Sequence, residues 1–225
     1  MPSKTFVGLS KIKQEKIFSS AVKEFSNKGY SLASTNNICK EAGISKGSMF
    51  QYFSTKEDLF FFVIRKALSE VIGFYKKNYQ FDVEKMDLKD IFIKSCLQLI
   101  DFYEKYPFHY RLYLRTNYEI DAPNYKEIRR YLVRYVSTIT HRFIDVGKKR
   151  KVLRDDISKE LALFLINSFL SRFVEICFIP GIEPTFNVGK FSAAERTKTL
   201  EEIYTFLIEG MGIRQVNLNQ EKEIK

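Results

Sequence analysis

The chain has 225 residues, 45% of them hydrophobic, and a formal net charge of +10. Its length suffices for one large or two small domains, and its hydrophobic content excludes an intrinsically disordered chain. The basic balance favours a polyanionic partner, either nucleic acid or an anionic membrane surface, although many soluble proteins are basic without one. Only 10 Gly and 5 Pro interrupt long stretches of helical apolar spacing, so the sequence predicts an all-α fold.

The cysteines and the hydropathy of the chain indicate in which cellular compartment the protein is expected. Cys39, Cys96 and Cys177 lie far apart and form no CxxC pair, so we expect free thiols and neither a metal site nor a cofactor. The N-terminal segment lacks the apolar core of a signal peptide. The most apolar run, residues 161–170, is too short to span a bilayer. We therefore expect a cytoplasmic protein with no membrane partner.

Apolar spacing, capping residues and breaks place a succession of helices along the chain. Gly29 is predicted to cap the end of the first helix, Gly43 to form the turn after the second, and Ser45 to cap the start of the third. Pro107 and Gly147 are predicted to end later helices. The predicted helices cover about residues 10–28, 35–42, 46–53, 56–79, 88–106, 107–116, 125–146, 158–178 and 193–212.

The second and third of these helices, residues 35–42 and 46–53, are short and joined by a turn that contains glycine, which is typical of a helix-turn-helix. The helix at 46–53 carries one charge, and such a slender helix suits the major groove of DNA. We expect Met49 and Phe53 to face inward with Ile44, leaving the other side for DNA. A small surface hairpin with no ligand is the alternative.

The outward side chains divide by their chemistry into groups that contact bases and groups that contact phosphates. Gly47 lets the backbone approach the duplex closely, Gln51 can pair with adenine, and Ser48 can reach a base edge or a phosphate. Phosphate contacts are also expected from this helix and from the first residues of the two neighbouring helices. These candidates are Lys46, Tyr52, Thr35, Asn36 and Lys56.

The helix-turn-helix region contains the runs Ala42-Gly43-Ile44-Ser45, Lys46-Gly47 and Lys56-Glu57-Asp58-Leu59. With these runs, residues 10–65 resemble the TetR family of bacterial transcriptional regulators. Two positions depart from the family pattern. Phe50 stands where the family usually has Tyr, whose hydroxyl typically contacts a phosphate, so we assign Phe50 to packing. Cys39 stands where Ala is usual, which is a small apolar exchange. The matching residues are Phe25, Gly29-Tyr30, Thr35, Ile38-Cys39, Ala42-Gly43-Ile44-Ser45, Lys46-Gly47-Ser48-Met49-Phe50-Gln51-Tyr52-Phe53 and Lys56-Glu57-Asp58-Leu59.

The resemblance implies an all-α protein with two domains. A three-helix helix-turn-helix domain for DNA binding covers residues 1–55. A helical domain for effector binding and dimerisation covers residues 56–225, and the helix at about 56–79 links the two. It also implies a homodimer on a pseudo-palindromic operator and, most often, a repressor that a small-molecule effector releases from DNA.

Two further sets of residues are candidates for effector binding and for dimer formation. Aromatic side chains suit an apolar or planar ligand, although ordinary core packing explains them equally well. The pocket candidates are Phe102, Tyr103, Tyr106, Tyr110, Tyr113, Phe169 and Phe173. The last two long helices each carry a second apolar face, which predicts a four-helix dimer interface, with internal packing as the alternative. The interface candidates are Phe164, Ser168, Ser171, Glu175, Ile203, Leu207 and Met211.

Three other functions are weighed against the repressor. A transcriptional activator of the same fold would use the same residues. A non-specific DNA-binding protein would use the positive charge without base contacts. An enzyme is disfavoured, because the sequence carries no GxSxG, P-loop or HExxH motif, and we expect no catalytic residue.

Overall fold

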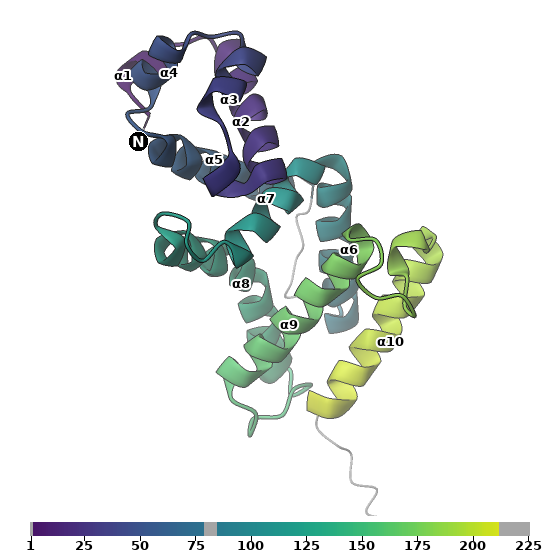
Figure 1. The fold of residues 1–225 in the computed structure, drawn as a ribbon. Coiled ribbons are helices and arrows are strands. Elements are labelled where there is room, and N and C mark those ends of the chain that lie inside the picture. The colour runs from purple at the N-terminus through teal and green to yellow at the C-terminus, as the bar shows by residue number, and fades with distance from the viewer. Residues whose placement is uncertain (1, 79–84, 212–225) are drawn as a thin grey trace, which may run out of the picture. The chain divides into compact units, whose positions relative to one another are not determined.

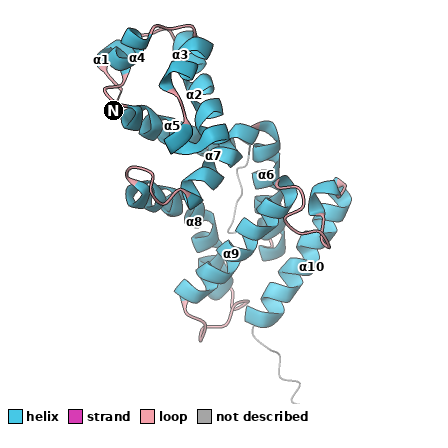
Figure 2. Ribbon diagram, in the orientation of Figure 1, coloured by secondary structure: helices cyan, strands magenta, loops and turns pink. Residues whose placement is uncertain are grey.

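The computed structural model describes residues 2–78 and 85–211. Every regular element in these residues is a helix (Figures 1 and 2), so the all-α prediction is confirmed for them. The elements are α1 (Lys4–Val7), α2 (Lys11–Leu32), α3 (Thr35–Ala42), α4 (Lys46–Tyr52), α5 (Lys56–Asn78), α6 (Leu88–Lys105), α7 (Pro107–Tyr118), α8 (Tyr125–Lys149), α9 (Lys159–Phe178), the 3-10 helix η1 (Val188–Lys190) and α10 (Ala193–Met211).

Packing divides the chain into two compact units. The first comprises residues 1–80 and 101–135, and the second comprises residues 81–100 and 136–225. α6 and α8 contribute residues to both. The domain boundary at residue 55 stays a prediction, because these units are defined by packing and not by independent folding.

Serine side chains cap the starts of several helices, and four of these caps lie at helices whose starts the sequence predicts closely. The hydroxyls of Ser10, Ser34, Ser45 and Ser158 accept hydrogen bonds from backbone N–H groups in the first turns of α2, α3, α4 and α9. The predicted starts of these helices therefore agree with the structure to within a residue. The predicted ends at residues 79 and 212 lie outside the described residues.

Gly29 breaks the helical path of α2 at the place where the sequence predicts the first helix to end, but its conformation is not that of the predicted left-handed cap. Its φ of 72° and ψ of 178° suit glycine alone, and the helix resumes up to Leu32. The reason is a close approach by a side chain from a distant part of the sequence. A Cβ built on Gly29 would lie 1.6 Å from Glu119 Oε1, and Glu119 Oε2 accepts a hydrogen bond of 2.7 Å from the backbone N–H of Tyr30.

Gly147 also lies within a helix, whereas the sequence predicts that it ends one. α8 continues to Lys149. A Cβ on Gly147 would lie 2.7 Å from Leu153 Cδ1 and 3.2 Å from Leu88 Cδ2. Glycine therefore serves tight packing in the core of the second unit and not chain termination.

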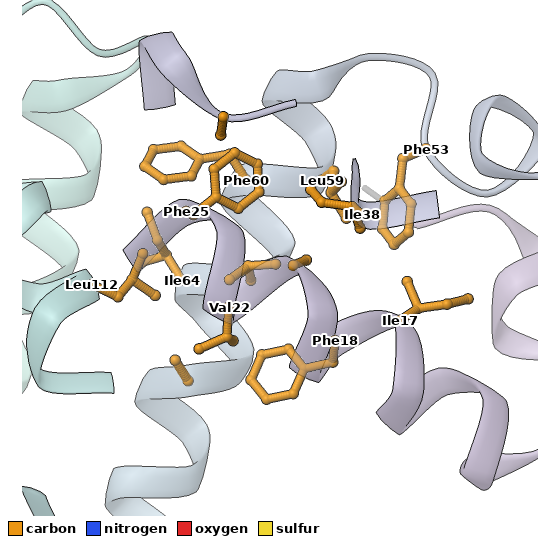
Figure 3. Close-up of a cluster of buried hydrophobic side chains, with 14 of the residues drawn as sticks. Ile17, Phe18, Val22, Phe25, Ile38, Phe53, Leu59, Phe60, Ile64 and Leu112 are labelled. Carbon is orange, nitrogen blue, oxygen red and sulfur yellow. The ribbon is translucent and has the colours of Figure 1, made fainter. Parts of the chain in front are cut away.

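The first unit is built around one apolar cluster, part of which is shown in Figure 3. Phe25 of α2 and Phe60 of α5 lie with their ring centroids 4.9 Å apart. Ile38 of α3 and Leu112 of α7 belong to the same cluster. α7 is therefore packed into the unit that carries the two short helices. The second unit has a separate core formed by side chains of α6, α8, α9 and α10.

Replacing Gly29 by alanine should destabilise the protein. The new Cβ would require an unfavourable positive φ and would displace the Glu119 carboxylate, so we expect a loss of about 2–3 kcal/mol in the free energy of unfolding. Gly73→Ala in α5 is the matched control, because a Cβ there meets nothing within 4 Å and should stabilise the helix by up to about 1 kcal/mol. Urea denaturation measures both variants, and equal effects would contradict this account.

Candidate nucleic-acid interface

α3 and α4 are joined by a turn whose geometry is set by Gly43. This residue adopts the left-handed conformation, with φ 67° and ψ 39°, and its N–H donates to carbonyls in the last turn of α3. The N–H of Ile44 also donates to the carbonyl of Cys39 at 3.0 Å. Ser45 then caps α4 by accepting a hydrogen bond of 3.0 Å from the N–H of Ser48. The structure thus contains the helix-turn-helix that the sequence predicts.

α4 has a buried face and an outward face. Met49 and Phe53 are each 1% exposed and pack into the core, as predicted. The outward positions include Lys46, Gly47 and Gln51, which are all exposed. Ser48 is half-buried, and its hydroxyl lies 2.9 Å from Ser45 Oγ.

Tyr52 and Phe50 occupy the opposite environments from those that the sequence predicts. Tyr52 is predicted to face outward, but it is 5% exposed, and its ring meets Phe6 edge-on at 6.0 Å. Phe50 is predicted to pack, but it is 46% exposed. The cause is helical spacing: Tyr52 follows Met49 by three residues and shares its buried face, whereas Phe50 follows Gly47 by three residues and shares the outward face.

α1 supports α4 from a side that the sequence analysis misses. Ser3 N–H donates a hydrogen bond of 2.9 Å to the carbonyl of Tyr52. Phe6 is 2% exposed, and its ring centroid lies 4.9 Å from that of Phe53 and 5.1 Å from that of Phe62. The one available signal was Ser3 as a helix cap, and a four-residue helix is too short for apolar spacing to reveal it.

The predicted phosphate ligands at helix starts differ in their exposure. Asn36 is exposed and Thr35 is half-buried at the N-terminus of α3. Both lie where the positive end of the helix dipole favours an anion. Their contact with phosphate stays a prediction.

Lys56, the third residue of this kind, contacts its own chain. Its Nζ donates to the carbonyl of Ser31 at 3.2 Å and lies 4.7 Å from the ring centroid of Tyr30. Burial lowers the pKa of the Lys56 ammonium, and the charges of Glu24 and Glu119 act in the opposite direction. Lys56 therefore holds the segment that follows Gly29, and a further contact with phosphate stays a prediction.

A polar clasp joins the end of α2 to α7, and it consists of Asn27, Tyr30, Arg111, Arg115 and Glu119. Arg115 Nη2 donates to the Asn27 carbonyl at 3.0 Å, and Arg111 Nη1 donates to Asn27 Oδ1 at 3.2 Å. Glu119 accepts from the Tyr30 N–H and lies 3.8 Å from Arg115 Nη1. Arg111, Arg115 and Glu119 follow one another at intervals of four residues, so they lie on one face of α7 and at its C-terminal cap.

Five of the predicted pocket residues form a chain of ring contacts in the first unit. Ring centroids lie 5.3 Å apart for Phe102 and Tyr103 and 4.8 Å apart for Phe102 and Tyr106. The corresponding distances are 4.7 Å for Tyr103 and Tyr110 and 6.4 Å for Tyr110 and Tyr113. Burial raises the pKa of the Tyr103 hydroxyl. Their role as an effector pocket stays a prediction.

α9 has an exposed apolar face as well as a buried one. Leu161, Phe164 and Leu165 are 49%, 66% and 40% exposed, and their spacing places them on one side of the helix. On the other side Phe173 is buried and Phe169 is half-buried in the core of the second unit. The whole helix is long and apolar enough, by length and composition, to cross a membrane, although Arg172 and Glu175 follow the run at residues 161–170. The core helix of a soluble protein meets the same two criteria.

The polar residues predicted at the dimer interface do not share one environment. Ser168 is exposed and Ser171 is half-buried. Glu175 is 9% exposed and pairs with Arg172 at 3.4 Å. Its low exposure places Glu175 on the buried side of α9, where Arg172 of the same helix balances its charge.

The apolar residues of α10 also divide between the core of the second unit and solvent. Ile203 and Leu207 are half-buried and pack against the core of the second unit. Phe206, which the sequence analysis did not select, is 73% exposed. The side chain of Met211 lies outside the described part of the structure.

The fold and the outward face of α4 define a helix-turn-helix protein. Comparison with known proteins finds a matching family model: residues 17–62 match the model of the bacterial regulatory proteins of the tetR family. The match includes all of α3 and α4 and parts of α2 and α5. Residues 17–62 are thus similar to the tetR family, and the resemblance seen in the sequence is confirmed.

Relatives and solved structures agree with this assignment. The chain is 36% identical over 76 residues to an HTH-type transcriptional regulator of Staphylococcus aureus, a match that covers 32% of this chain and 41% of the relative. It is 36% identical over 56 residues to the HTH-type transcriptional regulator HbdR of Aromatoleum, covering 25% and 24% of the two chains. The matches thus span less than half the length of these curated relatives.

The likeness of the fold extends further than the likeness of the sequence. The crystal structure of a TetR family transcriptional regulator from Chloroflexus aurantiacus superposes with a TM-score of 0.73 and 21% identity, over 95% of this chain and 100% of that chain. The C-terminal helices therefore follow the fold of that regulator.

Removing the Phe6 ring should loosen the support of α4. Phe6→Ala would empty a buried site between α1, α4 and α5, and we expect a cost of about 3 kcal/mol in the free energy of unfolding. Faster hydrogen exchange of the α4 amides should accompany it. Val7→Ala is the control, because Val7 is 66% exposed and its truncation should cost less than about 0.5 kcal/mol. Unchanged exchange in α4 would mean that α1 does not support this helix.

Proposed function

We propose that this chain is a sequence-specific, DNA-binding transcriptional regulator that acts in the cytoplasm and on the nucleoid. The observation that carries this proposal is Gly47 on the outward face of α4. A Cβ there would meet only Ser45 Oγ, at an ordinary distance of 3.8 Å. Glycine within a helix costs about 0.5–1 kcal/mol relative to alanine, and packing within the chain does not require it. A duplex that approaches the α4 backbone closely would require it.

The chemistry of the outward face supports entry of α4 into the major groove. The exposed amide of Gln51 can donate to and accept from an adenine edge. Lys46, at the start of the helix, and Asn36, at the start of α3, can contact phosphates on either side of the groove. In this proposal Gln51 determines which base sequence is preferred, whereas Lys46 and Asn36 add affinity for DNA of any sequence.

The exposed face of α9 supports a homodimer. Leu161, Phe164 and Leu165 form an apolar surface that a second copy would cover through an isologous contact. The exposed ring of Phe206 on α10 would add to it. A two-fold dimer would present two α4 helices to half-sites about 34 Å apart, or a multiple of this distance, on one pseudo-palindromic operator.

The clasp between α2 and α7 supports regulation by a small molecule. The ring contacts from Phe102 to Tyr113 lie in the same unit as the clasp, and α7 carries members of both. A ligand that binds more tightly when α7 has moved would shift the protein away from its DNA-binding state, and DNA would weaken ligand binding by the same factor. We propose repression relieved by such an effector, as is commonest in the family that the sequence resembles.

The test is selection of binding sites from random duplexes at about 0.15 M salt, followed by sequencing. We expect a pseudo-palindrome to be enriched. An unenriched pool together with equal affinity for all duplexes would contradict sequence-specific regulation and favour a non-specific DNA-binding protein.

Gly47→Ala should change the stability of the fold and the affinity for DNA in opposite directions. We expect it to stabilise the fold by up to about 1 kcal/mol, because alanine is the better helix former, and to weaken binding of the selected operator on the order of tenfold, because the new methyl group holds the duplex away from α4. Gly73→Ala should stabilise the fold similarly and leave binding unchanged. Thermal unfolding and operator titration measure the two effects, and undiminished binding by Gly47→Ala would remove the main support for the proposal.

Phe164→Glu should convert the dimer to a monomer. The buried carboxylate would be costly in an apolar interface, and Phe164 is exposed within its own chain, so the subunit should stay folded. Ile120→Glu is the control, because Ile120 is 66% exposed in the first unit. Sedimentation should show a monomer for the first variant alone. A dimeric Phe164→Glu variant would place the interface elsewhere.

A further inference from the structure

The exposed ring of Phe50 is the feature of α4 that the contacts described above leave unexplained. All seven residues of α4 are described, and Phe50 is its one large apolar side chain with substantial exposure, 46%. It follows Lys46 by four residues and Gly47 by three, so it lies on the outward face with both. Packing within the chain gives no reason to place a phenyl ring at the centre of this polar face.

We propose that Phe50 recognises a thymine through its C5-methyl group and is a specificity-determining residue of the DNA-binding helix. This inference rests on the proposed function. A phenyl ring has no hydrogen-bond donor or acceptor, so it cannot pair with a base edge or with a phosphate oxygen. The thymine methyl is the apolar group that base pairs present in the major groove. Stacking on a base would instead require an unstacked nucleotide, which a helix in the groove of an intact duplex does not meet.

The neighbours of Phe50 favour this contact. Gly47 has no side chain on the same face, so α4 can approach until the ring of Phe50 reaches the base edges. Gln51 is the next residue and is also exposed. The group that suits adenine and the group that suits a thymine methyl are therefore adjacent, and we expect neighbouring A·T pairs at the positions that α4 contacts.

The experiment uses the duplex obtained by selection and replaces each thymine in turn by deoxyuridine, which lacks only the C5-methyl group. For the native protein, binding should weaken about fourfold at one thymine in each half-site, as expected for one buried methyl-sized group. Phe50→Ala should bind the thymine and deoxyuridine duplexes equally at that position. Phe50→Leu, which keeps an apolar side chain, and Gln51→Ala should both retain the difference.

The outcomes separate this inference from the function on which it rests. If no sequence is enriched, the proposed function and this inference are both overturned. If an operator is bound specifically but none of its thymines is sensitive to deoxyuridine, only the inference about Phe50 is overturned. The same holds if Phe50→Ala still discriminates between the two duplexes, because another group would then contact the methyl. Thermal unfolding of Phe50→Ala should match the native protein, since the ring is exposed.

Discussion

The carboxylate of Glu119 closes over the one position in α2 that only glycine can occupy, and the arrangement of the first unit depends on this contact. Gly29 breaks the helical path there, and Ser34, five residues later, caps the start of α3. Glu24 strengthens this connection by accepting a hydrogen bond of 2.9 Å from the N–H of Ser34. The positions of α3 and α4 are therefore linked to α7 through the backbone and not only through apolar packing.

α4 is supported on two sides by apolar groups, while its third side carries exposed polar residues and the exposed ring of Phe50. Met49 and Phe53 attach it to the core, and Phe6 covers Tyr52 from the direction of α1. A helix this short has little intrinsic stability in water, so its conformation comes from these contacts. The outward residues of α4 therefore do not need to stabilise the helix. A glycine that weakens the helix can be retained among them for this reason.

Most of the architecture could be predicted from local signals, and the failures have a common physical origin. Serine caps, the left-handed Gly43 and apolar spacing act within a few residues, so they located α2 to α4 well. The reason for glycine at positions 29 and 147 cannot be predicted locally, because the groups that require it, Glu119 and Leu153, come from other elements or from the chain beyond the helix. Tyr52 is predicted wrongly because its hydroxyl suits a phosphate contact, whereas its spacing from Met49 places it inward. Phe50 is predicted wrongly because the resemblance, and not helical spacing, assigns it to packing.

The support that α1 gives to α4 has a consequence for the order of events in folding. α1 is made before α2, α3 and α4, yet its docking surface on Tyr52, Phe53 and Phe62 exists only after those helices and the start of α5 have formed. A single four-residue turn with one buried ring can also detach while the rest of the unit stays folded. The support from α1 can thus be completed only after the rest of this surface has formed, whereas Met49 and Phe53 hold α4 in the core independently of α1.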